Sequence, residues 1–246
     1  MKILAFNSSP RKKRGMTAAI LGPFLDGAKE AGAEIELIYV ADLDVKPCLG
    51  CFTCWLKTPG RCVHRDDMAP GSKARVLEKV VASDVLVLGT PLYADGMTGT
   101  MKTMIERFVP LVEPYFETVD GRTRHPGRQG RHDAQVVLVS VSGFPEIENF
   151  DVLVEHVKAI CANLRTRFAG AVLRPGAPLI PFLKEQGVPV DDVFAAAREA
   201  GRQLVCDGAM SPHTLAAVAR TLAPVEAIHQ GANAYFKQVL DRLADA

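Results

Sequence analysis

The sequence predicts a doubly wound α/β domain, in which helices cover both faces of a parallel sheet. The first observation is a series of short, uninterrupted apolar runs, such as 84–89 (DVLVLG), which are typical of strands buried on both faces. The second observation is that amphipathic stretches separate these runs. Strands and helices that alternate in this way form βαβ units, and therefore a parallel sheet.

The expected elements follow one another along the first two thirds of the chain. The segment 34–40 alternates between apolar and polar residues and is expected to be a strand. The four cysteines that follow it lie in a long loop. The five strands are expected at 2–6, 34–40, 84–89, 134–141 and 168–173, and the helices at about 15–31, 71–82, 98–109 and 150–165.

The pattern changes after Arg174, where prolines interrupt a loop over 175–189. Three further helices are expected at about 191–207, 212–221 and 224–243. We therefore divide the chain into an α/β domain over 1–174, with the cysteine loop at 46–68, and a helical extension over 175–246. The extension is expected to pack on the sheet or on a partner subunit rather than to form an independent domain.

The composition argues against several classes of protein. With 48% hydrophobic residues, the 246-residue chain can bury a sizeable core. Its net charge of +1 gives no footprint for nucleic acid or for a membrane surface. No apolar run approaches the roughly 20 residues that span a bilayer, and the segment 1–6 is too short for a signal peptide. We therefore expect a cytoplasmic protein without nucleic-acid or membrane partners.

Four of the six cysteines lie in one stretch with the spacing C-x2-C-x2-C-x7-C. Gaps of two residues let successive thiolates surround one centre, as an iron–sulfur cluster or a thiolate-bound zinc requires. In the cytoplasm, clustered cysteines are more often ligands or redox groups than structural disulfides. The other two, Cys161 and Cys206, lie in helical patterns and are expected in the core. The candidate ligands are Cys48, Cys51, Cys54 and Cys62.

The loop after the first strand has the parts of a phosphate site. Ser8, Ser9 and Thr17 offer hydroxyl groups. Gly15 permits a close backbone approach, the following helix offers its N-terminal amides, and Arg11 can pair with a phosphate. The loop lacks the GxGxxG pattern of dinucleotide sites. These groups together suit one terminal phosphate, although an ordinary basic loop before a helix can contain the same residues.

Two further loops follow strands whose carboxyl ends are expected beside the first. In the loop 90–100, Pro91 and two glycines fix the backbone, and Tyr93 and Met97 can contact a flat ring. The same residues also suit a tight connection whose side chains pack in the core. The loop 140–145 can close the other side of a pocket. The backbone amides expected there are those of Ser142, Gly143 and Phe144.

Three motifs occur in an order that resembles a known family. Residues 6–11 (FNSSPR) with 15–17 (GMT) look like the phosphate loop, written GSPRxxGNT, of the NAD(P)H-dependent FMN reductases of flavodoxin-like fold. Residues 90–107 look like the flavin-ring loop of that family and the helix after it. The cysteine stretch that ends at 62–68 is similar to the branch called iron–sulfur flavoproteins. The resemblance covers about residues 2–170.

The resemblance implies a flavodoxin-like sheet of order 2-1-3-4-5, one FMN per subunit, and a homodimer or homotetramer with FMN near a subunit interface. The chain departs from the family pattern where Ser8 replaces a glycine and Met16 an asparagine, and its loop is one residue longer. The phosphate residues implied by position are Ser9, Arg11, Gly15, Met16 and Thr17. The residues implied around the flavin ring are Pro91, Leu92, Tyr93, Ala94, Asp95, Gly96 and Met97.

The sequence therefore predicts an FMN-dependent oxidoreductase that passes electrons from NAD(P)H, or from a reduced carrier, to a small redox acceptor or a redox protein. No catalytic side chain is expected, because FMN carries the chemistry. The four cysteines are expected to hold a [4Fe–4S] cluster. Two alternatives stay open. One is a flavin or quinone reductase whose cysteines are free thiols or a redox disulfide, and the other is a non-enzymatic carrier or binding module with structural zinc.

Three other features have two interpretations each. The basic segment 121–132 can attract the extra phosphate of NADPH or can be a solvated loop. His64 can replace Cys62 as a ligand or can lie on the surface. Trp55 can shield the cysteine site or can pack at an interface.

Overall fold

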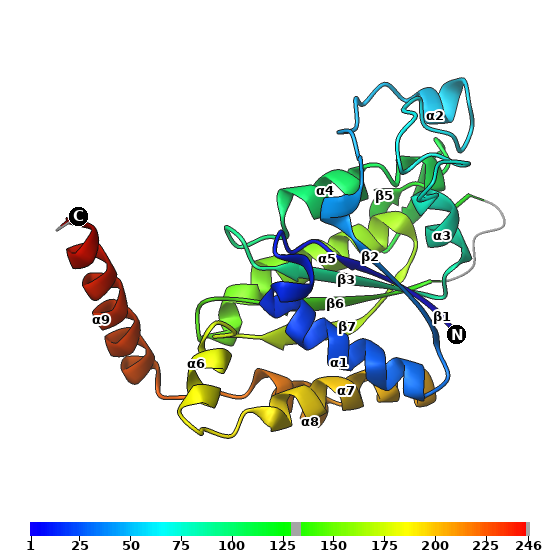
Figure 1. Ribbon diagram of the computed structural model, residues 1–246. Coiled ribbons are helices and arrows are strands. Elements are labelled where there is room, and N and C mark those ends of the chain that lie inside the picture. Colours follow the sequence, from blue (N-terminus) through cyan, green and yellow to red (C-terminus); the bar gives the residue numbers. More distant parts are fainter. Residues whose placement is uncertain (129–133, 245–246) are drawn as a thin grey trace.

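The computed structural model describes residues 1–128 and 134–244 and contains a five-stranded parallel sheet (Figure 1). All neighbouring strands of this sheet pair in parallel. The order β2-β1-β3-β6-β7 confirms the flavodoxin-like prediction, because β6 and β7 are the fourth and fifth parallel strands along the chain. The strands are β1 (Lys2–Asn7), β2 (Glu34–Tyr39), β3 (Val85–Pro91), β6 (Gln135–Val141) and β7 (Arg167–Arg174).

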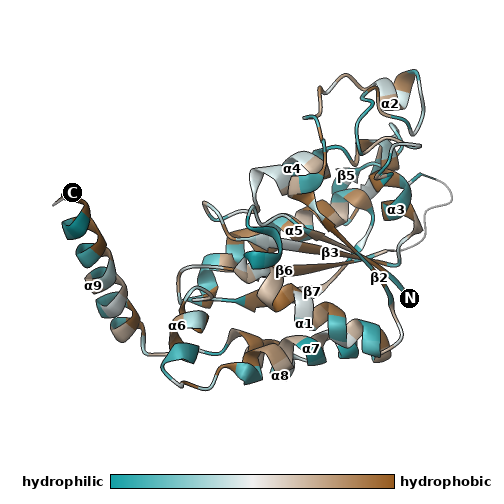
Figure 2. Cartoon of the chain, viewed as in Figure 1, coloured by the Kyte–Doolittle hydropathy of each residue, from teal (hydrophilic) through white to brown (hydrophobic). Residues whose placement is uncertain are grey.

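Helices cover both faces of the sheet. One layer contains α1 (Met16–Glu30), α7 (Asp191–Cys206) and α8 (Pro212–Ala219). The other contains α3 (Val76–Ala82), α4 (Gly99–Glu106) and α5 (Asp151–Leu164). Successive strand residues point to opposite faces, so Ala5 packs with the first layer and Phe6 with the second. Figure 2 shows the strands as an apolar band between these layers.

The start of the helical extension packs directly on α1. A Cβ atom added to Gly27 of α1 would lie 1.9 Å from the carbonyl oxygen of Arg198, and one added to Gly201 of α7 would lie 1.9 Å from that of Phe24. The two backbones therefore approach closely because each helix has a glycine at the contact. Val193 and other buried residues of α7 belong to the same core cluster as the sheet. The extension was predicted to pack either on the sheet or on a partner subunit. Helices α7 and α8 pack on the sheet domain of their own chain.

The last helix is arranged differently. Helix α9 (Val225–Ala244) contains no buried residue and projects away from the rest of the chain (Figure 1). Several of its large apolar side chains are exposed. They are Tyr235, Phe236, Leu240 and Leu243.

Some short elements differ from the prediction. The helix expected at 71–82 begins only at Val76, because Arg75 before it has a left-handed conformation. The proline-rich loop contains the short helix α6 (Leu179–Glu185). Between α4 and β6, where no strand is predicted, the chain forms a hairpin of β4 (Glu117–Val119) and β5 (Arg122–Arg124). Part of the basic segment 121–132 lies outside the described residues.

One expectation about the remaining cysteines is wrong. Cys161 is buried, as predicted, but Cys206 at the end of α7 is exposed. The helical pattern placed it correctly on α7 but not on the buried face, which ends with Leu204. Among the described residues, no helix is both long enough and apolar enough to span a bilayer.

Candidate functional site

The three predicted cofactor loops leave the same edge of the sheet. Strands β1, β3 and β6 are parallel neighbours, so their carboxyl ends lie side by side. The Ser8 N–H donates to the Gly89 carbonyl at 2.8 Å, and the Leu92 N–H donates to the Val141 carbonyl at 2.8 Å. The fold thus brings the loops after Asn7, Pro91 and Val141 together, as the sequence predicts.

The first loop is held close to the start of α1. The Asn7 Oδ1 accepts a hydrogen bond from the Ser9 N–H at 2.9 Å, which turns the chain back. A Cβ atom added to Gly15 would lie 2.4 Å from the Ser9 Oγ, so a larger residue here would force the Ser9 hydroxyl to move. Ser8 and Ser9 are buried, whereas Arg11 is exposed. Arg11 therefore lies at the exposed rim of the loop.

Thr17 offers an unused donor at the first turn of α1. Its side chain is 1% exposed, and its Oγ1 has no hydrogen-bond partner among the described residues. Met16 beside it is partly buried. The first N–H groups of a helix also lack intrahelical partners and attract negative charge. The hydroxyl, the helix start and the Gly15 turn together fit a phosphate group.

The second loop is a tight hairpin that presents Tyr93. Its N–H and carbonyl exchange hydrogen bonds with Gly96 at 3.0 and 3.1 Å, and Ala94 and Asp95 between them both have positive φ. Tyr93 is 53% exposed, whereas Met97 is buried in the core. Met97 therefore packs in the core, as one alternative for this loop expects. Tyr93 points outwards, as the other alternative requires for contact with a ring.

Side chains of the sheet fix the base of this second loop. The Thr90 Oγ1 accepts from the Thr98 N–H at 3.1 Å, and the Ser140 hydroxyl donates to the Thr90 carbonyl at 2.8 Å. Pro91 is buried at the end of β3, and Leu92 is partly buried. The backbone of the loop is thus anchored to two strands while its tip stays open.

The third loop contributes fewer groups than expected. The Ser142 N–H donates to the Arg174 carbonyl at 3.1 Å, and its hydroxyl donates to the Phe144 carbonyl at 2.8 Å. Both donors of Ser142 are therefore used within the fold. Gly143 and Phe144 are exposed at the same edge. Their amides are the remaining candidates from this loop.

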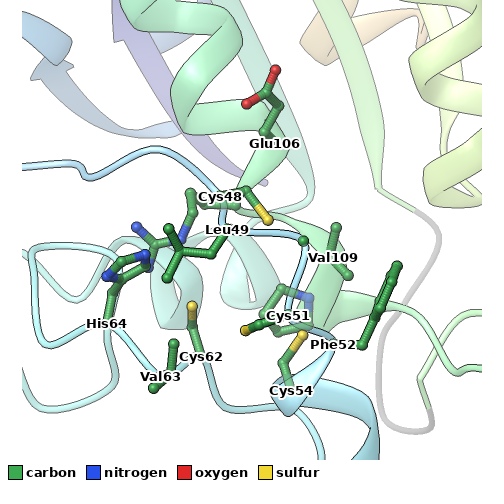
Figure 3. Close-up of a pocket in the computed structure, with 13 residues that line it drawn as sticks. Cys48, Leu49, Cys51, Phe52, Cys54, Cys62, Val63, His64, Glu106 and Val109 are labelled. Atoms are coloured by element: carbon green, nitrogen blue, oxygen red, sulfur yellow. The ribbon is translucent and has the colours of Figure 1, made fainter.

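The four clustered cysteines line one cavity of about 120 Å³ (Figure 3). All four are free thiols. Cys54 is buried, Cys62 is partly buried, and Cys48 and Cys51 are exposed. Leu49, with Phe52, Val63, Val109 and Pro110, gives the cavity an apolar lining. Within residues 1–128 and 134–244, however, no group of three or more Cys, His, Asp or Glu side chains is arranged to hold a metal ion.

The environments of two of these thiols differ. Burial raises the pKa of Cys54, and the neighbouring thiols of Cys62, Cys48 and Cys51 raise it further. Hydrogen bonds to Thr53 lower the pKa of Cys51. The mutual influence on Cys54 indicates that the four thiols lie near one another. The donor set and its apolar surroundings thus fit a thiolate-bound centre, although the sulfur atoms are not arranged as ligands.

A buried ion pair joins the ends of the cysteine loop. Arg107, just after α4, binds Asp66 through two nitrogens and also donates to the Lys46 carbonyl at 2.7 Å. Asp66 accepts from the N–H groups of Lys46 and Met68. Burial lowers the pKa of Arg107, but Asp66 and the Cys62 thiol together outweigh this and keep the pKa above its ordinary value. Sequence reasoning noted Arg107 only as part of a motif and missed Asp66.

Two other side chains lie at or beside the cavity. The Trp55 Nε1–H donates to the Val112 carbonyl at 2.9 Å, and its ring stacks on Phe52 at 5.0 Å between centroids. Trp55 thus packs within the chain beside the cysteine cavity. His64 also lines the cavity, and its Nε2 lies 3.1 Å from the Pro47 carbonyl.

Helix α4 connects the two candidate sites. The Tyr93 loop precedes its first residue, and Glu106 at its end lines the cysteine cavity. An eight-residue helix rises about 12 Å. The Tyr93 loop and the cysteine cavity therefore lie at opposite ends of one short helix.

Comparisons with solved structures agree with the fold. The FMN-dependent NADH-azoreductase of Bacillus anthracis, solved with FMN, aligns with a TM-score of 0.57 and 17% identity over 83% of this chain and 99% of that chain. The NAD(P)H:quinone oxidoreductase of Methanothermobacter marburgensis aligns with a TM-score of 0.56 and 16% identity over 83% and 96%. At such low identity, these likenesses show the fold alone.

Sequence comparisons reach further. An iron–sulfur flavoprotein of Archaeoglobus fulgidus is 39% identical over 107 residues, which are 44% of this chain and 48% of the relative. Another from that organism is 31% identical over 146 residues, 59% of this chain and 58% of the relative. The chain thus spans about half the length of the curated relatives it matches. The model of the NADPH-dependent FMN reductase family matches residues 1–171, and the chain therefore belongs to this family.

Proposed function

We propose that this protein is an FMN-dependent oxidoreductase that accepts electrons from NAD(P)H and passes them to a small redox acceptor or a redox protein. The observation that carries the proposal is the buried Thr17 hydroxyl at the start of α1, which has no hydrogen-bond partner among the residues that the structure describes. It lies at the sheet edge where three loops meet, in a chain of a flavin reductase family. Bound FMN would supply the hydride acceptor and electron carrier.

The chain's own residues would bind and orient the flavin. Thr17 and the amides at the start of α1 would hold the phosphate, and Arg11 at the rim would add positive charge. The amides of Gly143 and Phe144 would face the polar edge of the ring and stabilise negative charge on it. Tyr93 would cover the ring and exclude water.

The flavin proposal is tested by binding. Apo protein titrated with FMN, with quenching of flavin fluorescence as the readout, is expected to bind one FMN per chain. Riboflavin, which lacks the phosphate, is expected to bind far more weakly, because the proposed contacts at α1 are made by the phosphate. Equal affinities for FMN and riboflavin would contradict this placement of the phosphate.

We further propose that Cys48, Cys51, Cys54 and Cys62 hold a [4Fe–4S] cluster. Their shared apolar cavity and the iron–sulfur flavoprotein relatives support this. The cluster would supply a one-electron carrier near the flavin. Because the thiols are not arranged as ligands, assembly would have to bring their sulfur atoms together around the cluster.

Iron and acid-labile sulfide, assayed after anaerobic reconstitution, test the cluster. Cys51→Ala removes one proposed ligand and is expected to lose most of the iron. Cys206→Ala is the matched control, because Cys206 is an exposed thiol outside the cavity, and it is expected to keep the iron. Zinc in place of iron and sulfide would support structural zinc, and metal-free protein with full reductase activity would support free thiols.

Copies of the chain are proposed to associate as a homodimer or homotetramer. Helix α9 supports this, because it is 20 residues long, contains no buried residue and exposes large apolar side chains. Exposed apolar surfaces of this kind mark protein interaction sites.

A further inference from the structure

A fixed positive charge lies beside the cysteine cavity. The side chains of Arg107 and Asp66 are both fully buried, with Nη1 and Oδ2 at 2.5 Å and Nη2 and Oδ1 at 3.2 Å. Arg107 also lines the cavity that the four cysteines surround. The guanidinium therefore faces the carboxylate on one side and the thiol cavity on another, away from water.

Anchoring the loop explains only part of this arrangement. The Nη1 of Arg107 donates to the Lys46 carbonyl at 2.7 Å, and Asp66 Oδ2 accepts from the Lys46 N–H at 3.0 Å. Asp66 Oδ1 accepts from the Met68 N–H at 3.2 Å. These contacts hold both ends of the loop, and they use the two terminal nitrogens of Arg107.

The Nε–H of Arg107 is left over. It is buried and has no hydrogen-bond partner within the part of the chain that the structure describes. A buried donor without an acceptor is costly, so a partner is expected when the site is complete. Cys62 and Arg107 line the same cavity. A thiolate sulfur at the cavity would supply the acceptor.

We propose that Arg107 is a functional residue of the cysteine site, whose Nε–H donates to a ligand sulfur and whose charge raises the reduction potential of the cluster. This inference rests on the proposed cluster. One-electron reduction adds a negative charge to the centre, and a buried cation nearby stabilises that charge. Hydrogen bonds to sulfur and the local net charge are established determinants of cluster potentials.

The test is the midpoint potential of the reconstituted cluster. It is measured by anaerobic titration with dithionite, on proteins with matched iron and sulfide content. Arg107→Met is expected to lower the reduction equilibrium constant at least about tenfold, or about 59 mV for a one-electron couple. Asp66→Asn removes the counter-charge but leaves the guanidinium, and is expected to raise the potential. A purely structural role would not produce opposite shifts.

Arg128→Met is the matched control. Arg128 is partly buried and pairs with Glu113, and it donates to the Pro110 carbonyl at 3.0 Å, but it does not line the cavity. Its loss is expected to leave the potential unchanged. Arg107→Lys keeps the charge without the Nε–H, and is expected to lower the potential less than Arg107→Met does.

The outcomes separate this inference from the proposed cluster. If wild-type protein binds no iron and sulfide, the proposed cluster is wrong, and this inference is wrong with it. If wild-type protein holds the cluster, but the Arg107 and Asp66 variants leave its midpoint potential unchanged or shift it in the same direction, this inference alone is overturned. Loss of the cluster from Arg107→Met, Arg107→Lys and Asp66→Asn, with native circular dichroism, would limit the pair to anchoring and would also overturn it.

Discussion

Thr17 is the residue whose environment depends most clearly on a missing partner. A buried hydroxyl without a hydrogen bond destabilises the protein that contains it. Within the described part of the chain, the Thr17 Oγ1 at the first turn of α1 has no hydrogen-bond partner. The free protein therefore carries a cost that a bound phosphate would remove, and this distinguishes a binding residue from one that only supports the fold.

Thr17→Val is expected to separate these two roles. Loss of a hydrogen bond to a charged group costs about 1.5–3 kcal/mol, so the FMN dissociation constant should rise roughly ten- to a hundredfold. The apo protein should keep or gain thermal stability, because the unpaired hydroxyl is gone. Thr17→Ser retains the hydroxyl and serves as the control. A Thr17→Val protein with unchanged FMN affinity would remove Thr17 from the site.

The cysteines outside the cavity differ in chemistry for a local reason. Burial raises the pKa of Cys161 to about 11, whereas Cys206 is exposed. The thiolate is the reactive form, so a raised pKa shifts alkylation to higher pH. At mildly alkaline pH, iodoacetamide should modify Cys206 and spare Cys161, as measured by peptide mass spectrometry. Rapid alkylation of Cys161 in the folded protein would show that this site is open.

Among the elements, the contact of α1 with α7 depends on two glycines. A methyl group at Gly27 would overlap the Arg198 carbonyl, and the helices would have to separate. Gly27→Ala is therefore expected to lower the free energy of unfolding by about 1–3 kcal/mol, measured by urea denaturation. Gly99→Ala on α4 is the control, because no atom lies within 4 Å of the added methyl group. Equal effects of the two substitutions would contradict this packing.

Prediction from sequence succeeded where one element determines its own structure. Strands β3 and β6 are continuous apolar runs, and their buried pattern follows directly. Strands β4 and β5 have three residues each and are mostly polar, so the Asp120–Gly121 turn between them was the only available signal. Helix α6 was missed because prolines at 178 and 181 suggested a loop.

The candidate site also contains both kinds of feature: some follow from a single element, and others arise only from packing between elements. The shared position of the three predicted loops could be foreseen because each directly follows a strand, and parallel strands end at one edge. Arg107 and Asp66 lie 41 residues apart, and neither is unusual in its own segment. Their pairing arises only when α4 packs beside the cysteine loop. Pairs made by tertiary contact are therefore the part of the site that sequence patterns do not reveal.

At the scale of the whole molecule, α9 is separable from the fold. Its residues contribute nothing to the buried core. Deletion of 225–246 is therefore expected to leave the free energy of unfolding of the remaining chain nearly unchanged, while sedimentation equilibrium shows a smaller assembly. A truncated protein that keeps the full oligomeric mass would place the interface elsewhere.

The whole molecule also places two candidate redox sites at opposite ends of α4. This arrangement would explain why one chain combines the proposed flavin-binding sheet edge with a cysteine loop. Electrons that enter at the sheet edge would have a short path along one face of the protein. In the proposed function the flavin would be the point of entry, and every later step would depend on it.

The most direct test is anaerobic addition of NADH or NADPH to the purified protein with one bound FMN, followed by visible absorption. The account predicts that at least one of the two nucleotides bleaches the flavin bands rapidly, and that Thr17→Val protein at the same FMN concentration shows less bleaching. A protein that retains no FMN, or whose bound flavin stays oxidised with both nucleotides, would contradict the proposed function.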